Sequence, residues 1–384
     1  MKQWNMAVTG VILVSLAMVS LVGCGDSSDL GAAPAETIFY PPAPDPPRLQ
    51  FLTQITNLNA NKSHSKSSFA DFVVGAKIEQ GEKIQSPYGV AARNGKIYVC
   101  DLAISNIYVI DVANNKFSML GKRGVLKKPV NLTIAPDGTK YVADTGLNKV
   151  VIFDAQDRFV RYIGDSMRAS PIDVALCKGE LIVSNIKDNE IEAWSLDGKF
   201  LRKIATFGGG VTQLRMPTNL EVGPDGRIFV SETLNGIIKV YNNKGQYLGS
   251  VGAQGNRSGF FARPKGLAID PKGILYVVDS QWEIVQMFDP AGRVLMVFGG
   301  AKPGLDGMGI PMGIAIDRTS IPAFKKYIDK DFQAEYLVFV ANQHGPNKIG
   351  VYAFGKSKTA DYNVKKPLTA AKPSAATQPA KTPE

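Results

Sequence analysis

The feature that most constrains this chain is a motif that recurs six times. Each copy opens with a proline, and successive copies start 42, 42, 46, 47 and 47 residues apart, at Pro87, Pro129, Pro171, Pro217, Pro264 and Pro311. In the copy at 129–154, three short runs of apolar residues are separated by tight polar turns, a pattern typical of an antiparallel meander. Such a unit cannot bury both faces of its sheet alone, so the copies must pack against one another.

A period of about 40 to 50 residues with four strands per unit is typical of a β-propeller blade. Fourth, outer strands are expected at residues 159–164, 200–207, 247–252 and 294–299. The sixth copy ends at its third strand, and the segment Phe69–Gly75 aligns with the outer strands, so we expect it to complete the last blade. Arg48–Ile55 is also strand-like and could add outside it. The sequence therefore predicts an all-β, six-bladed propeller of four-stranded antiparallel blades, closed by an N-terminal strand.

The chain resembles the NHL-repeat family of six-bladed propellers. The resemblance is carried by P-x-G at 87–89, 264–266 and 311–313, by P-D-G turns at 136–138 and 224–226, and by V-A-D-T at 142–145. It covers about residues 69–355 and implies the fold, but it does not imply one chemistry, because NHL propellers serve as lyases, RNA-binding modules and docking surfaces.

The N-terminal residues resemble a bacterial lipoprotein signal. Residues 1–23 contain an apolar run too short for an ordinary membrane span, followed by Leu21-Val22-Gly23-Cys24, which resembles a lipobox. This resemblance implies export and acylation of Cys24, and Gly25 after it favours the outer membrane. Residues 24–47 are then a spacer rich in Pro, Ala and Gly, residues 48–355 the propeller, and residues 356–384 a disordered Lys, Ala and Pro tail.

The remaining cysteines and the histidines limit the cofactor chemistry. Cys100 and Cys177 occupy positions of small residues in other copies, so both are expected to be buried and unpaired. The chain has no C-x-x-C-H for covalent haem, and two histidines, His64 and His344, are too few for a multi-histidine metal centre. We expect no cofactor.

Blade six carries an insertion at residues 318–334. Pro322 favours a helix start, and Phe324, Tyr327, Ile328 and Phe332 fall on one face of a short amphipathic helix. That face either packs on the propeller or docks a partner.

Two rings of residues are expected at the central funnel. In gluconolactonases, which are similar propellers, a metal ion is held at the positions that here follow the repeat prolines, namely Tyr88, Val130, Ile172, Thr218, Lys265 and Met312, and these do not form a hard-metal ligand set. One residue further on are Gly89, Asn131, Asp173, Asn219, Gly266 and Gly313. The group Asn131, Asp173 and Asn219 could bind a small polar ligand, or could satisfy backbone groups near the axis.

An acid or amide follows the second strand of every copy, at Asp101, Asp144, Asn185, Glu232, Asp279 and Asn342. These positions repeat around the ring, far from one another, and Asp or Asn there commonly hydrogen-bonds its own turn. We expect a structural role rather than a metal site.

Basic residues gather in the loops that precede the repeat prolines. The chain has a formal net charge of +10. Lys128, Arg168, Arg215 and Arg263 fall on one face of a propeller, with Lys265 and Tyr88 expected at the funnel mouth. Such a face would attract an anionic partner, although a basic surface can also serve solubility alone.

Together these features predict a lipid-anchored envelope scaffold that docks an acidic protein. By resemblance to accessory propellers of envelope complexes, a multihaem cytochrome is one such partner, and an exported protein is not expected to bind nucleic acid. The alternative is an enzyme of the lyase or lactonase type with its site at Asn131, Asp173 and Asn219.

Overall fold

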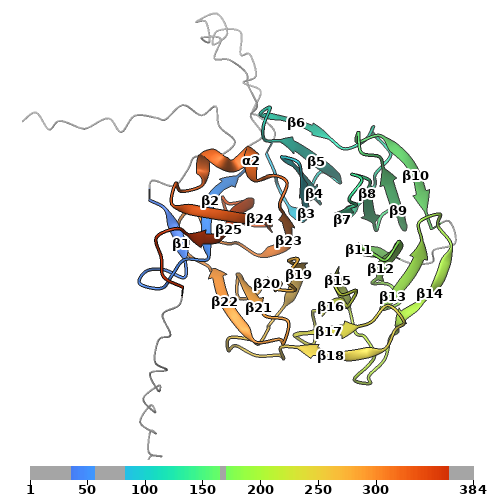
Figure 1. Cartoon of the computed structure of the whole chain (residues 1–384). Coiled ribbons are helices and arrows are strands. Elements are labelled where there is room, and N and C mark those ends of the chain that lie inside the picture. The colour runs from blue at the N-terminus through green and yellow to red at the C-terminus, as the bar shows by residue number, and fades with distance from the viewer. Residues whose placement is uncertain (1–35, 57–82, 165–169, 363–384) are drawn as a thin grey trace, which may run out of the picture.

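A computed structural model of the 384-residue chain describes residues 36–56, 83–164 and 170–362. In these ranges the strands form six antiparallel sheets arranged as blades around one axis (Figure 1). Five sheets have four strands, and the sixth has a fifth strand at its outer edge. The predicted six-bladed propeller is confirmed.

The strands of each blade follow one another from the axis outwards. The innermost strands are β3 (Pro87–Arg93), β7 (Pro129–Ile134), β11 (Pro171–Cys177), β15 (Pro217–Val222), β19 (Pro264–Ile269) and β23 (Pro311–Asp317). The second strands are β4 (Lys96–Asp101), β8 (Lys140–Asp144), β12 (Glu180–Asn185), β16 (Ile228–Glu232), β20 (Leu275–Asp279) and β24 (Phe332–Asn342). The third strands are β5 (Asn106–Asp111), β9 (Lys149–Phe153), β13 (Glu190–Ser195), β17 (Ile237–Tyr241), β21 (Ile284–Phe288) and β25 (Ile349–Ser357). The outer strands are β6 (Lys116–Met119), β10 (Phe159–Ile163), β14 (Phe200–Ala205), β18 (Tyr247–Val251), β22 (Val294–Gly299) and β2 (Leu49–Ile55), with β1 (Ile38–Tyr40) beside β2.

The core lies between neighbouring blades. Second strands such as β8 and β16 are buried at every residue, because each has a blade packed on both faces. Outer strands such as β18 and β22 are buried at few residues, because their outer side faces solvent. Val142 and Val151 of blade two share a cluster with Tyr98 and Val109 of blade one, which shows how one blade covers the next.

The ring is closed by β2 and not by the strand that the sequence favoured. The last sheet has the order β1-β2-β25-β24-β23, so Leu49–Ile55 occupies the place predicted for Phe69–Gly75, and that prediction is wrong. Residues 69–75 lie outside the described residues. The reason is burial on both faces of β2, where Leu49, Phe51, Leu52 and Ile55 are fully buried.

β1 adds outside β2 and lies within the range expected to be a spacer. Ile38 pairs with Phe51 and Tyr40 with Leu49, so the folded chain begins well before residue 48. At the other end, the Tyr362 hydroxyl donates a 2.5 Å hydrogen bond to the Pro47 carbonyl. The folded chain therefore continues past the predicted end at residue 355.

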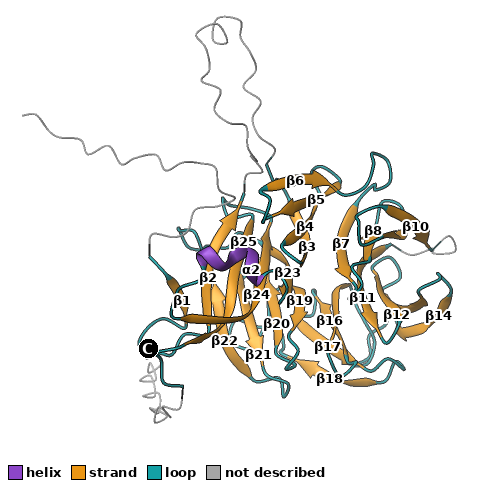
Figure 2. Ribbon diagram, turned by 45° about the horizontal axis from the view of Figure 1, so that its top comes forward, coloured by secondary structure: helices purple, strands orange, loops and turns teal. Residues whose placement is uncertain are grey.

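The insertion in blade six packs on its own blade. It forms one helical turn, α2 (Ile321–Phe324), followed by the 3₁₀ turn η1 (Lys325–Tyr327), beside the last blade (Figure 2). Phe324 is 1% exposed, and its ring centroid lies 5.8 Å from that of Phe339. Because Phe332 is buried in the same cluster, the apolar face of the insertion is already covered and cannot serve as a docking helix.

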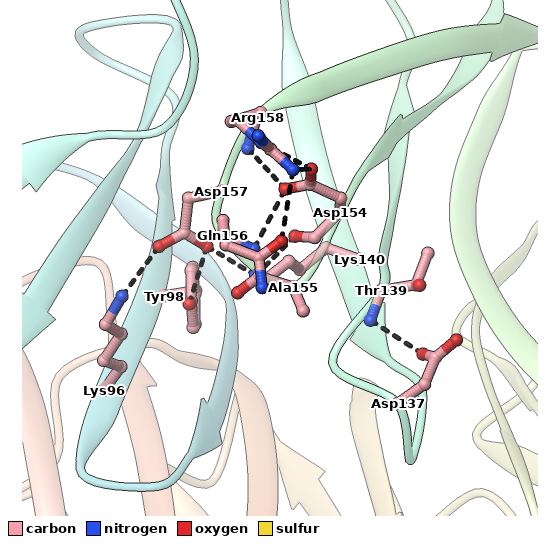
Figure 3. A network of polar contacts seen from close by, with 10 residues as sticks. All are labelled: Lys96, Tyr98, Asp137, Thr139, Lys140, Asp154, Ala155, Gln156, Asp157 and Arg158. Carbon is pink, nitrogen blue, oxygen red and sulfur yellow. Dashed lines mark hydrogen bonds and ion pairs between the residues drawn. The ribbon is translucent and has the colours of Figure 1, made fainter.

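A polar network joins blades one and two (Figure 3). Asp157, in the turn between β9 and β10, accepts hydrogen bonds from Lys96 Nζ at 2.9 Å and from the Tyr98 hydroxyl at 2.8 Å. It also pairs with Lys140, whose side chain is 3% exposed. Burial opposes ionisation of Asp157, but the hydrogen bonds from Lys140, Lys96 and Tyr98 hold its pKa below the ordinary value. The network therefore fixes the relative position of two blades.

Candidate functional site

The same irregularity occurs in all six inner strands. In each blade the pairing register shifts immediately after the repeat proline, as between Pro129 and Asn131 or between Pro264 and Leu267. A β-bulge leaves one residue unpaired and redirects its side chain. The unpaired positions include Tyr88, Val130, Ile172, Thr218, Lys265 and Met312, which we call the neck.

Four of the neck side chains meet although they come from four blades. Tyr88, Val130, Ile172 and Met312 form one buried apolar cluster. Since the inner strands surround the centre of the ring (Figure 1), these side chains converge on the axis. The neck is thus a mainly apolar constriction.

The glycines that follow the neck allow the inner strands to approach closely. A Cβ at Gly266 would lie 2.6 Å from the Met312 carbonyl oxygen, and one at Gly313 would overlap the Tyr88 carbonyl oxygen. The P-x-G motif therefore has a packing reason at Gly266 and Gly313, because a side chain at either position would overlap the neighbouring inner strand.

The structure brings Asn131, Asp173 and Asn219 together from three successive blades. Asp173 Oδ2 accepts hydrogen bonds from Asn219 Nδ2 at 3.2 Å and from the Leu220 backbone at 3.0 Å. The Asn131 side chain adds a further hydrogen bond to Asp173. Asn219 Oδ1 is buried without a partner in the described part of the chain.

This polar group lies at one end of an axial cavity of about 140 Å³. Apart from Asn131, Asp173 and Gly266, the cavity is lined by residues three to five positions after the repeat prolines, such as Thr133 and Ile316. It therefore extends from the neck towards the face of the propeller opposite the repeat prolines.

Glu221 is a second carboxyl in this cavity, and the sequence analysis missed it. Burial raises the pKa of Asp173 to about 7, against the opposing effect of its hydrogen bonds. Burial, with a smaller contribution from the charge of Asp173, likewise raises the pKa of Glu221 to about 8. One signal could have revealed it, since the equivalent positions in the other repeats hold Ala91, Thr133, Ala175, Ala268 and Ala315.

The repeated acids support loops, as predicted. Asp144 accepts hydrogen bonds from the backbones of Lys127 at 2.8 Å, Lys128 at 2.9 Å and Leu147 at 2.9 Å. Asp279 does the same for the loop at 262–263. Asn342 departs from the pattern, because its buried side-chain atoms have no partner in the described residues.

The basic residues divide into an exposed set and a buried set. Lys128, Arg215 and Arg263 are exposed. Lys128 and Arg263 directly precede their inner strands and Arg215 lies two residues before its own, so the three share one face, which we call the rim. Arg168 lies outside the described residues. Tyr88 and Lys265 are each only 6% exposed, so they belong to the neck and not, as expected, to the exposed docking surface.

The described residues limit other kinds of site. They contain no group of three or more His, Cys, Asp or Glu side chains placed to hold a metal ion, and no helix long and apolar enough to cross a membrane. Cys100 and Cys177 are buried free thiols, as predicted. Cys24 lies outside the described residues.

Comparisons with known proteins support the fold. No family model matches the chain, and no curated protein matches it. A solved gluconolactonase from Xanthomonas campestris is 13% identical, with a TM-score of 0.51 over 84% of this chain and 98% of that one. A protein of unknown function from Bacteroides thetaiotaomicron is 15% identical, with a TM-score of 0.52 over 70% of each chain. Virginiamycin B lyase from Staphylococcus aureus is 18% identical, with a TM-score of 0.49 over 71% of this chain and 96% of that one. The first two similarities show a shared propeller fold alone, and at these identities they say nothing about chemistry.

Proposed function

We propose that this chain is an exported, lipid-anchored binding protein of the cell envelope that docks an acidic protein partner on its rim. The observation that carries the proposal is the placement of Lys128, Arg215 and Arg263. All three are exposed on one face. Together they make this face positive, which speeds encounter with an anionic surface.

The rim is also rigid. The backbone N–H groups of Lys128, Arg215 and Arg263 are each held by a buried carboxylate, from Asp144, Glu232 and Asp279 respectively. A fixed backbone reduces the entropy lost on association, so it favours a docking role.

Cys24 supplies the anchor in this proposal, with the outer membrane as its site. The partner class is an acidic protein, such as a multihaem cytochrome or another component of an envelope complex. Nucleic acid is not proposed, because an exported protein seldom meets it.

The experiment combines charge reversal with partner capture. The triple variant Lys128→Glu/Arg215→Glu/Arg263→Glu lowers the net charge of +10 by about six units and leaves the core untouched. The full-length lipoprotein is purified from its native membrane, and the chains that co-purify are identified. Association of the purified partner with the variant should be at least about tenfold slower at low salt, and the difference should shrink as salt rises.

A matched control uses the opposite face. Lys178, Lys244 and Lys272 are exposed in turns on that face, so their reversal changes the net charge equally. If both triple variants slow association by the same factor, the effect reflects total charge and the rim has no special role.

A funnel enzyme is the second candidate, and the carboxyl pair Asp173 and Glu221 favours it. Groups with pKa values near 7 can transfer protons at neutral pH. However, the cavity of about 140 Å³ is smaller than the roughly 300 to 1,000 Å³ of usual ligand sites, so we place docking first. If Asp173→Ala abolishes an activity of the protein while the rim variant retains it, the proposed function changes from docking to catalysis in the funnel.

A further inference from the structure

Three lysines of the described chain are buried, and one of them has no partner. Lys140 pairs with Asp157, and Lys239 Nζ lies 3.1 Å from Glu232 Oε2. Lys265 is 6% exposed, yet its ammonium group makes no hydrogen bond or ion pair within the described residues. Lys265 is thus a largely buried residue without a counter-ion in that part of the chain, although its ammonium nitrogen is not fully enclosed, so a ligand that supplies a negative charge there would be bound favourably.

The backbone of Lys265 is held firmly in place. Ser231 Oγ donates a 2.5 Å hydrogen bond to the Lys265 carbonyl, and Thr233 Oγ1 donates a 2.7 Å bond to the Pro264 carbonyl. Both hydroxyls come from the neighbouring blade. Together with the bulge after Pro264, they fix the direction in which the Lys265 side chain leaves the strand.

No acid in residues 36–56, 83–164 or 170–362 pairs with this lysine. Burial, together with the positive charge of Arg263, lowers the pKa of Lys265 to about 8. Asp173, the carboxyl just beyond the neck, acts instead on Tyr88, whose pKa is raised by burial and by that charge. Lys265 is therefore still mostly protonated at neutral pH and is free to pair with an added anion.

The surroundings indicate the kind of anion. Tyr88, Val130, Ile172 and Met312 make the neck apolar, and a carboxylate on a short apolar stem would match one ammonium group within such a wall. A phosphate would bring two charges to a single cation and is a poorer match.

We propose that the neck binds one carboxylate group on a short apolar stem, with Lys265 as its counter-ion. The site is distinct from rim docking and does not depend on it. The carboxylate can belong to a free short-chain acid or to an acidic side chain of a docked protein.

The test follows the ionisation of Lys265 by NMR on protein with ¹³C-labelled lysine. Adding sodium propionate to on the order of 100 mM, enough to fill a site of millimolar Kd, should raise the Lys265 pKa by at least about one unit, a tenfold preference for the charged form. Equal concentrations of propionamide and of sodium chloride should not. An unchanged pKa, or the same rise with chloride, overturns the proposal.

Two variants and two peptides complete the experiment. Lys265→Met should abolish the propionate-dependent shifts of neck resonances while keeping or raising the melting temperature, because it removes a buried unpaired charge. Lys128→Met should retain those shifts, and so should the rim triple variant, so the two proposals can fail separately. A blocked Gly-Glu-Gly peptide that competes with propionate, where Gly-Gln-Gly does not, identifies a protein side chain as a source. If propionate binds and neither peptide competes with it, the ligand is a free acid. If no carboxylate binds, the proposal is overturned.

Discussion

Asp173→Asn should change how the stability of this protein depends on pH. The folded structure raises the pKa of Asp173 from 3.8 to about 7 by burial. A group with a raised folded pKa stabilises the fold fully below its unfolded pKa, and that contribution is lost as pH rises through the folded pKa. For Asp173 the window runs from about pH 4 to about pH 7, and the loss amounts to at most about 4 kcal/mol.

The substitution also has a cost that does not depend on pH. Asp173 Oδ2 accepts from the Leu220 backbone and from Asn219 Nδ2, and an amide nitrogen placed there would face two donors. Losing these bonds costs about 1 to 3 kcal/mol. Relative to the native chain, Asp173→Asn should therefore gain about 2 to 3 kcal/mol of stability between pH 5 and pH 8, and should equal or exceed it at pH 8.

Urea unfolding at pH 5, 6, 7 and 8 measures this difference directly. Asp137→Asn is the matched control, because Asp137 is exposed in a turn and its pKa is lowered by hydrogen bonds from Thr139, so it does not titrate in this range. A difference between Asp173→Asn and the native chain that stays constant from pH 5 to pH 8 would refute the claim that Asp173 is held partly protonated by burial.

Three further predictions concern the fold. Asp157→Asn should lower the free energy of unfolding at neutral pH by about 2 to 4 kcal/mol, because Lys140 loses its buried counter-ion, and an effect below about 0.5 kcal/mol in urea would show that the network is not structural. Gly313→Ala should lower the free energy of unfolding by at least about 3 kcal/mol. Gly209→Ala should change it little, because the added Cβ would meet only the flexible end of an arginine side chain. Equal losses in the two variants would contradict the close approach of the inner strands. A chain that starts at residue 57 should aggregate while one that starts at residue 36 stays monomeric by size-exclusion chromatography, because only the first exposes the edge of β25; identical behaviour would count against closure by β2.

Most of the fold could be predicted because the same sequence motif occurs six times in the chain. Each repeat carries the proline, the alternating strands and the turn acid, so a weak signal in one blade is supported by the other five. The strand that closes the ring occurs only once, so no other repeat supports its prediction. Leu49–Ile55 is apolar at adjacent positions because both of its faces are covered, and Phe69–Gly75 resembled the exposed outer strands more closely. The prediction relied on the similarity of Phe69–Gly75 to the other outer strands, whereas the strand that closes the ring is the one whose two faces are both buried.

The candidate site was found in part. Asn131, Asp173 and Asn219 were placed correctly because they occupy one position of the repeat. Lys265 was expected at the funnel mouth among the partner-binding residues, whereas the structure buries it in the neck, because a bulge changes the direction of a side chain without changing the sequence pattern around it. Side-chain direction at a bulge is a property of strand pairing, which a single sequence does not specify.

Two residues that depart from the repeat pattern make the two ends of the propeller axis different. Lys265 is the only cation among the neck residues, and Glu221 is the only acid at its own repeat position. The cation lies next to the rim, whereas the carboxyls of Asp173 and Glu221 lie beyond the neck, towards the opposite face. The two ends of the axis therefore carry different ionisable groups, an amine at the rim end and two carboxyls beyond the neck. The residues that follow the repeat build the ring, and those that depart from it distinguish its two faces.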